Sequence, residues 1–328
     1  MTYATRQQAR DRKSVLVRKH YLAQNFVSVN EFLEEQVRFL TDCNRLGTAM
    51  NYRRAAASLS GFLQGKELYF PEMDAAFIER YNDWLLRRGL VKNSVSFHMR
   101  ILRAVYNKAV RYGYAEQTFP FRDVYTGIDR TRKRAVGEAV IARLIRLDLT
   151  NEPALSFTRD LFLFSVYTRG MAFVDMAYLR KADLQDGCIR YARRKTGRPL
   201  SVRVEPCIRT LIDRYSDHTD GSPWLFPILD SGDPVTCYRR YKSNLRAYNR
   251  RLKDLSWRLG PDVALSSYTS RHTWAMMARS HDVPISVISA GMGHSSERTT
   301  QIYLNSLEDS LVDNANRGIL EALAEIGS

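Results

Sequence analysis

Residues 271–303 read RHTWAMMARSHDVPISVISAGMGHSSERTTQIY, and no other stretch is as informative about this chain. Arg271 comes first, His294 follows a glycine, and Tyr303 comes nine residues after the histidine. A phenol supplies an oxygen nucleophile, a guanidinium holds phosphate oxygens, and an imidazole donates a hydrogen bond or moves a proton. The stretch therefore predicts attack on a phosphodiester, although a lone helical tyrosine is more often a core aromatic.

The charge of the chain points to a polyanionic partner. Its 328 residues include 50 Lys and Arg against 35 Asp and Glu, a formal net charge of +15. A basic excess of this size favours nucleic acid over a generic basic surface. The length is sufficient for two domains with separate cores.

Other motifs argue against several classes of protein. The four cysteines are scattered without a CxxC pair or zinc spacing, which favours reduced thiols in the cytoplasm. The chain has no phosphate loop and no carboxylate cluster for two metals, so we expect neither a cofactor nor a metal. We also expect neither a signal peptide nor a membrane span, because the first residues lack an apolar run after their charges and no apolar run reaches about eighteen residues.

The periodicity divides the chain into four parts. Residues 1–27 are predicted to be a basic arm, and the sequence does not decide which secondary structure it adopts. Residues 28–116 carry four helical patterns, near 28–40, 48–63, 74–88 and 94–112, and predict a compact helical domain. In residues 117–135 the periodicity lapses, which predicts a basic linker. Its cations Arg132, Lys133 and Arg134 are equally compatible with a solvated segment and with a strap against phosphates.

The second domain, residues 136–328, mixes helices with a small sheet. Helices are predicted near 138–147 and 154–167, and alternating residues predict strands at 188–192 and 200–204. Lys195-Thr196-Gly197-Arg198 would form the turn between the strands. Beyond them the chain is predicted to be helical, ending in an apolar stripe from Leu311 to Leu323.

The order and spacing of Arg271, His294 and Tyr303 resemble the C-terminal signature of the tyrosine recombinases, the phage integrase family. The resemblance covers about residues 28–310 and is specific only in the last third. It implies a mainly α fold with a small β-sheet: a helical, SAM-like core-binding domain followed by a mixed α/β catalytic domain. It also implies that Tyr303 cleaves DNA through a 3′-phosphotyrosine that keeps the bond energy, without metal or ATP.

Lys195 matches the lysine that serves this family as general acid on a β-hairpin, and two other positions depart from the family pattern. Tyr268 stands where the family most often has a histidine; it can donate a hydrogen bond but cannot accept a proton near neutral pH. Ala172 stands where the first catalytic arginine is expected. Arg169, three residues earlier, is our candidate to replace it, and the alternative is that this arginine has been lost.

The resemblance also implies that the helical domain binds DNA. Its candidate contacts, most of them to phosphate, are Tyr52, Arg53, Arg54, Lys92, Asn93, Ser94, His98 and Arg100. The expected partners are double-stranded recombination sites and further copies of the chain, as a dimer on each site and a tetrameric synapse. The sequence does not decide whether an accessory DNA-bending protein is needed. It also does not decide whether the C-terminal stripe packs in its own protomer or on the next.

Two other functions remain compatible with the sequence. A DNA-binding architectural or regulatory protein with an impaired site would explain the missing first arginine and Tyr268. A swivelling topoisomerase would use the same tyrosine chemistry, although the small helical domain and the integrase-like ending argue against it. The preferred interpretation is a site-specific recombinase that integrates, excises or inverts DNA.

Overall fold

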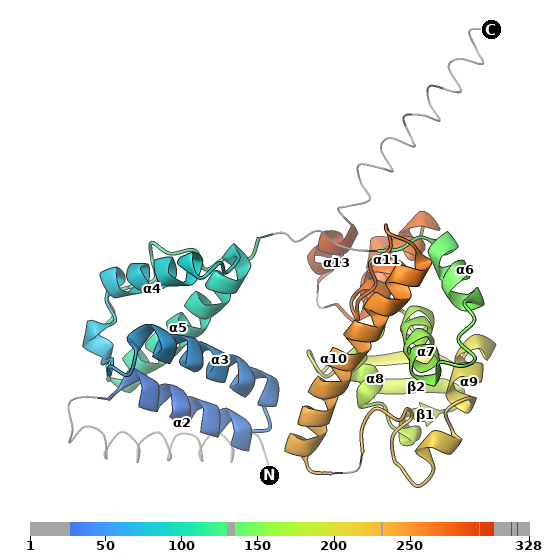
Figure 1. Ribbon diagram of the computed structural model, residues 1–328, viewed down its shortest axis with the longest axis horizontal. Helices are drawn as coiled ribbons and strands as arrows, with labels where there is room; N and C mark the ends of the chain where they lie inside the picture. The colour runs from blue at the N-terminus through green and yellow to red at the C-terminus, as the bar shows by residue number, and fades with distance from the viewer. Residues whose placement is uncertain are drawn as a thin grey trace. The chain divides into compact units, whose positions relative to one another are not determined.

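The structure is a computed structural model that describes residues 27–129, 135–230, 232–294, 296–304, 316 and 320, without the side chains at 302 and 303. The chain forms two compact units, residues 1–130 and 131–328, each with its own hydrophobic core (Figure 1). Residues 1–26 of the predicted arm lie outside the described residues, as do Arg132, Lys133 and Arg134.

Four α-helices build the first unit. They are α2 (Val29–Asp42), α3 (Leu46–Leu63), α4 (Ala75–Arg87) and α5 (Lys92–Tyr112), with the 3-10 turn η1 (Phe70–Glu72) before α4. Along α5, Val95, Met99 and Leu102 recur at helical spacing and are buried together. The helix ends at Gly113, whose φ of 79° is a left-handed conformation that glycine adopts without strain.

The chain after α5 stays attached to the first unit. Phe121 is buried in its core, and Ser96 Oγ donates to the carbonyl of Gly127 over 2.5 Å. The Asn93 side chain makes two hydrogen bonds with the backbone of Asp129, of 3.1 and 2.8 Å. The start of the segment predicted as a linker is therefore held on the N-terminal end of α5.

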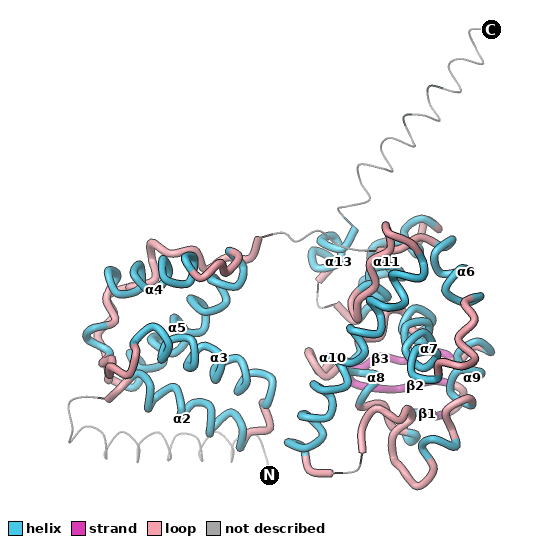
Figure 2. The backbone as a smooth tube through the Cα atoms, in the orientation of Figure 1, coloured by secondary structure: helices cyan, strands magenta, loops and turns pink. Residues whose placement is uncertain are grey.

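The second unit contains eight α-helices and three strands within the described residues (Figure 2). Its elements are α6 (Glu138–Arg146), α7 (Pro153–Tyr167), α8 (Phe173–Ala177), η2 (Lys181–Asp183), β1 (Leu184–Gln185), β2 (Cys188–Ala192), β3 (Pro199–Arg203), α9 (Pro206–Asp213), η3 (Asp217–Thr219), α10 (Pro234–Leu259), α11 (Thr269–Ser280), α12 (Ile285–Met292) and α13 (Glu297–Leu304).

The sheet is antiparallel, in the order β1-β2-β3. Ile189 pairs with Leu184 on one side and Val202 on the other, and Ile189 and Val202 are buried in the core of the unit. The sequence predicts the hairpin of β2 and β3 but not β1. A strand of two residues is too short to show alternation in a sequence.

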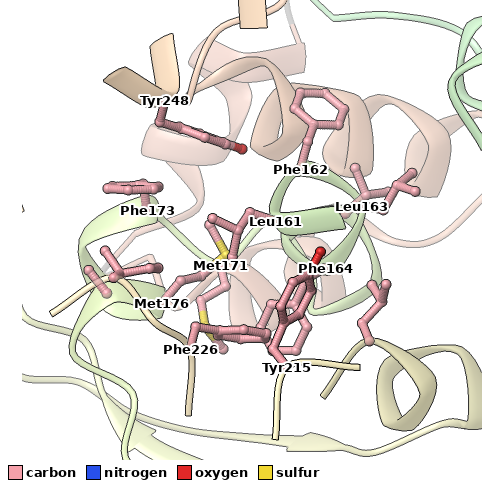
Figure 3. Packing of buried hydrophobic residues seen from close by; sticks show 14 of the residues in the cluster. Leu161, Phe162, Leu163, Phe164, Met171, Phe173, Met176, Tyr215, Phe226 and Tyr248 are labelled. Carbon is pink, nitrogen blue, oxygen red and sulfur yellow. The ribbon is translucent and has the colours of Figure 1, made fainter. Parts of the chain in front are cut away.

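Helix α7 is the centre of the second core, which explains why its residues are apolar on nearly every side. It packs against α6, α9, α10 and α11. Figure 3 shows the aromatic rings around it: Phe164 meets Phe226 edge to face at 4.7 Å, and Phe173 stacks on Tyr248 at 4.6 Å. The stacked pair joins α8 to α10 within this core.

The predicted fold class is confirmed: the chain is mainly helical with a small sheet, a helical first unit and a mixed α/β second unit. In the part of the chain that the structure describes, no helix combines the length and the apolar character needed to cross a bilayer.

Candidate active site

Arg271 is held in the first turn of α11, where that helix crosses α7. The neighbouring Ser270 shares a 2.8 Å hydrogen bond with Ser165 of α7. The buried guanidinium of Arg271 donates from Nη1 to the Gly170 carbonyl over 2.8 Å and from Nη2 to the Met292 carbonyl over 2.5 Å. The arginine is thus held by two backbone carbonyls, one from the loop after α7 and one from the last residue of α12.

Gly170 makes this crossing possible. Its φ is 72°, and a Cβ built on it would lie 2.7 Å from the Cα of Arg271. Any side chain there would push the backbone of α11 away, because real Cβ atoms do not approach so closely. Because residue 170 is a glycine, the backbone of Arg271 can pack closely against the loop that follows α7.

His294 bonds to Arg271 on one side and to Thr300 on the other. Its Nε2 lies 3.1 Å from Arg271 Nη2, and its Nδ1 lies 2.8 Å from Thr300 Oγ1. A guanidinium only donates hydrogen bonds, so Nε2 is the acceptor and the imidazole proton sits on Nδ1. Thr300 belongs to α13, so this contact ties the helix of Tyr303 to the histidine.

Burial and neighbouring cations keep His294 neutral. They lower its pKa to about 4; burial is the largest cause, followed by the charges of Arg271, Arg193, Lys195 and Arg198. At neutral pH the imidazole therefore has a lone pair that can accept a proton.

Lys195 lies in the turn between β2 and β3, as predicted from the alternating strands. The turn is closed by hydrogen bonds from the Arg193 amide to the Arg198 carbonyl, of 2.9 Å, and from the Gly197 amide to the Arg193 carbonyl, of 2.7 Å. The lysine side chain is exposed, yet its charge acts on His294. The turn therefore belongs to the same site as the histidine.

Two arginines of the hairpin were not singled out from the sequence, and they join it to the histidine loop. Arg193 Nη1 donates to the Gly293 carbonyl over 2.7 Å, and Arg198 Nη1 donates to the carbonyl of His294. Arg193 is buried, and its Nε lies 4.0 Å from Asp175 Oδ2. No local signal distinguishes such arginines from solvated ones, because their partners are about a hundred residues away.

Asp175 of α8 is buried beside the hairpin. Its Oδ1 accepts a 2.8 Å hydrogen bond from the Arg194 amide. Burial raises its pKa, while the Arg194 amide and nearby arginines act in the opposite direction. The carboxyl group fixes the start of the turn that carries Lys195.

Arg169 is half-buried directly after the last turn of α7, with a φ of 61° that is unusual for a residue with a side chain. Its Nη1 donates to the Ser201 carbonyl of β3 over 3.3 Å. Ala172, at the position of the missing arginine, precedes α8. Arg169 thus extends from the loop of Gly170 towards the hairpin.

Tyr268 and His272 form a pair at the start of α11. Tyr268 precedes the helix and is 48 % exposed, and its ring centroid lies 5.9 Å from that of the buried His272. The Tyr303 backbone belongs to α13, and its side chain lies outside the described part of the structure.

The candidate DNA contacts of the first unit fall into three groups. Arg53, Arg54 and Ser94 are exposed. Tyr52 is buried in the core, and His98 is half-buried, which lowers its pKa. The remaining three have intramolecular partners: Lys92 is 3.2 Å from Asp129, Asn93 bonds the backbone of Asp129, and Arg100 bonds the carbonyl of Ser96.

Helix α10 carries a basic row that was not predicted from the sequence. The helix is capped at its N-terminus by Asp233, whose side chain accepts from the amides of Val235 and Thr236. Lys242, Leu245, Arg246, Asn249, Arg250 and Lys253 line a hollow of about 370 Å³ along one face. Arg246, Arg250 and Lys253 make no ion pair within the described ranges. The signal in the sequence that could have revealed this row is the recurrence of cationic residues at the 3.6-residue period of a helix.

Comparisons with known proteins identify the family. The phage integrase family matches residues 138–309, and the phage integrase SAM-like domain matches residues 28–124.

The chain belongs to the phage integrase family of tyrosine recombinases.

The predicted resemblance is thereby confirmed, and the protein is a site-specific tyrosine recombinase. A similar curated protein is the tyrosine recombinase XerD of Rhizobium meliloti (strain 1021), 26 % identical over 286 residues, which cover 81 % of this chain and 87 % of the relative. XerD of Pseudomonas putida is 22 % identical over 258 residues, with 78 % and 85 % covered.

Solved structures share the fold of this recombinase. A lambda integrase dimer bound to a COC′ core site has a TM-score of 0.60 at 14 % identity, covering 88 % of this chain and 80 % of the other. The Tn1549 transposon integrase in complex with a circular intermediate DNA has a TM-score of 0.61 at 15 % identity, with 84 % and 95 % covered.

Proposed function

We propose that this recombinase cleaves DNA with Tyr303 as nucleophile, Arg271 as phosphate ligand, His294 as proton acceptor and Lys195 as general acid. The observation that carries the proposal is the buried Arg271–His294 pair, tied through Thr300 to α13. Residues three apart share one side of a helix, and position 303 follows Thr300 by three.

The reaction balances with these four groups. The Tyr303 phenolic oxygen forms a bond to phosphorus as the bond from phosphorus to the 5′-oxygen breaks. The phenol proton passes to Nε2 of His294, and the Lys195 ammonium gives a proton to the leaving 5′-oxygen. A 3′-phosphotyrosine and a free 5′-hydroxyl remain, and attack by a 5′-hydroxyl reverses each step.

The contact between Arg271 and His294 supports a route by which the histidine becomes available. Arg271 donates to His294 Nε2 in this structure. A phosphate oxygen is a stronger acceptor for a guanidinium than a neutral imidazole. Binding of the scissile phosphate would therefore draw Arg271 away from Nε2 and expose the lone pair to the phenol.

Arg169 is our candidate for the missing first arginine. It leaves the same loop whose carbonyl holds Arg271, which supports this role. Arg169→Ala is expected to slow cleavage by roughly 10²–10³-fold, the cost of removing one donor to a developing oxyanion. Near-normal cleavage in this variant, with Arg203→Ala as an exposed control on β3, would show that the site works without that arginine.

The DNA partner is proposed from charge and from the relatives. Arg53, Arg54 and Ser94 in the first unit are exposed groups that can meet phosphates, and so can the basic row on α10. Lambda integrase has been solved as a dimer on a core site and as a tetramer on a Holliday junction. By analogy, we propose a dimer on each site and a tetrameric synapse for this recombinase.

Covalent trapping tests the proposed chemistry. Protein–DNA adducts are recovered from cells expressing the chain, and the attached DNA is sequenced to find the target. A duplex of that sequence, nicked a few nucleotides to the 3′ side of the scissile phosphate so that the short fragment with the free 5′-hydroxyl diffuses away, should accumulate the adduct. Tyr303→Phe should give none, and digestion of the adduct should yield a nucleotide on the peptide of Tyr303.

Two outcomes would contradict the proposal. A nucleotide on another residue would remove Tyr303 from its role. Relaxation of supercoiled plasmid of arbitrary sequence, without sequence-specific adducts, would instead favour a swivelling topoisomerase.

A further inference from the structure

We propose that Arg193 and Arg198 form a clasp that positions Lys195, by fastening the β2–β3 hairpin to the backbone of the His294 loop. This proposal rests on the proposed role of Lys195 as general acid. The clasp is defined as these two arginines, which flank the turn on its two sides.

The clasp holds two consecutive peptide carbonyls. Arg193 donates to the carbonyl of Gly293 over 2.7 Å, and Arg198 donates to that of His294. The two arginines are also joined to each other, because the Arg193 amide donates to the Arg198 carbonyl over 2.9 Å. The result is a closed loop of contacts with the turn on one side and the histidine loop on the other.

Close packing supports the contact on the Arg193 side. Gly293 has a φ of 63°, and a Cβ on it would lie 2.8 Å from Arg193 Cδ and 3.0 Å from Leu200 Cδ1. Only a glycine lets the arginine stem pass so near the backbone. Arg193 is itself buried, unlike Arg190 on β2, which is exposed and pairs with Asp186.

Burying a guanidinium is costly, so a purely structural purpose would be better served by an apolar side chain. Arg193 has a buried carboxylate nearby, with its Nε 4.0 Å from Asp175 Oδ2. At the other end of the guanidinium, Nη1 donates a hydrogen bond to the carbonyl of Gly293. The hydrogen bond to Gly293 fixes the direction of the turn relative to the site, which a methionine stem would not do. The carboxylate of Asp175 balances the buried charge without a hydrogen bond to Nε.

Lys195 needs such positioning because it lies exposed at the tip of the hairpin, away from the core. It comes two residues after Arg193 and three before Arg198, so the clasp grips the hairpin immediately on either side of it. A general acid must come within hydrogen-bond distance of the leaving oxygen, and an error of about 1 Å can cost 10²-fold in rate. Arg193 and Arg198 are therefore positioning residues, and neither is proposed to touch DNA.

A change of leaving group distinguishes a variant with a misplaced general acid from a variant whose active site is damaged as a whole. A thiol ionises near a pKa of about 8.5, so a sulfur leaving group departs as thiolate and needs no proton donor. The full-length protein is given its recovered target duplex with either oxygen or sulfur as the 5′-bridging atom at the scissile phosphate. Single-turnover adduct formation is measured for each variant on both substrates.

Lys195→Ala and Arg193→Met should both be slow on the oxygen substrate, by on the order of 10²-fold or more, and near wild-type on the sulfur substrate. Arg193→Lys, which keeps one donor for Gly293, should restore part of the rate. Arg198→Met should show the same pattern, and it carries the test if Arg193→Met does not fold. Arg190→Met, the matched control on β2, should behave as wild-type on both substrates.

The possible failures are distinguishable. If sulfur rescues Lys195→Ala but leaves Arg193→Met and Arg198→Met slow, the clasp supports the fold and does not position the lysine. If both arginine variants are normal on oxygen, the clasp is dispensable and the inference fails. If sulfur does not rescue Lys195→Ala, the general-acid assignment itself fails.

Discussion

At the scale of single residues, Gly170 decides whether Arg271 can reach the site. Its left-handed backbone and its closeness to the Cα of Arg271 both exclude a side chain. Gly170→Ala is expected to lower the free energy of unfolding by about 1–3 kcal/mol through strain alone, and to lower the rate of adduct formation by shifting α11. Chemical denaturation and adduct formation measure the two effects.

Gly187→Ala is the matched control. Gly187 has a similar φ of 69°, but no described atom lies within 4 Å of its virtual Cβ. The variant should lose stability from strain and keep its cleavage rate. Equal cleavage rates in the two variants would mean that the close approach of Gly170 to Arg271 does not matter for the reaction.

His294 predicts a specific pH dependence of stability. Its pKa is about 4 in the folded protein and about 6.5 in an unfolded chain, so between these values the unfolded state binds more protons. Stability should therefore fall as pH drops from 6.5 towards 4 and then level off. The contribution of this histidine amounts to at most about 3 kcal/mol.

Chemical denaturation between pH 7 and 4 measures this contribution. His294→Gln should lose less stability on acidification than wild-type does. Identical pH profiles for wild-type and His294→Gln would contradict the prediction.

At the scale of elements, α10 predicts a DNA-binding face. Replacing Arg246, Arg250 and Lys253 by glutamine should weaken binding to any duplex. The slope of log K against log salt should fall by about one for each phosphate that the variant no longer neutralises. The paired α10 cations Arg240, 3.1 Å from Asp230, and Arg258, 2.5 Å from Glu152, provide the control double variant.

Two results would count against this face. An unchanged salt slope in the triple variant would exclude it as a phosphate-binding surface. An equally large decrease in affinity in the control variant would show that the effect is one of total charge. Trp257, 88 % exposed on the same helix, extends the test, because Trp257→Ala should weaken binding without changing the slope if its ring packs on DNA.

The elements also differ in how well the sequence predicts them. The helix of Val95 and Met99 and the hairpin around Lys195 follow from periodicity, because side chains at that spacing share one buried face. The strand β1 does not, since it exists only through pairing with β2. The basic row on α10 lies on one face because α10 is one unbroken helix from Pro234 to Leu259.

At the scale of the whole molecule, the chain forms two units with separate cores. We therefore predict that the intact chain binds DNA more tightly than the same chain cut between the units. A protease site placed within residues 130–134 should allow cleavage without a decrease in helical circular dichroism. Cutting should weaken DNA binding by roughly 10²–10⁴-fold, because the second unit then binds without the effective concentration of a tether. The uncut protein with the same insertion is the control, and equal affinity before and after cutting would show that one unit binds alone.

By itself, the sequence determined the order of the candidate site residues: Arg271, His294 and Tyr303, with a lysine hairpin before them and a helical unit ahead of both. It did so because residue type and local spacing are written in the chain. Only the tertiary structure decided how these groups are held. Gly170 meets Arg271 and Arg193 meets Gly293 across about a hundred residues, and the same packing keeps His294 neutral. Such contacts depend on how α7, α11 and the hairpin pack, which no local pattern encodes.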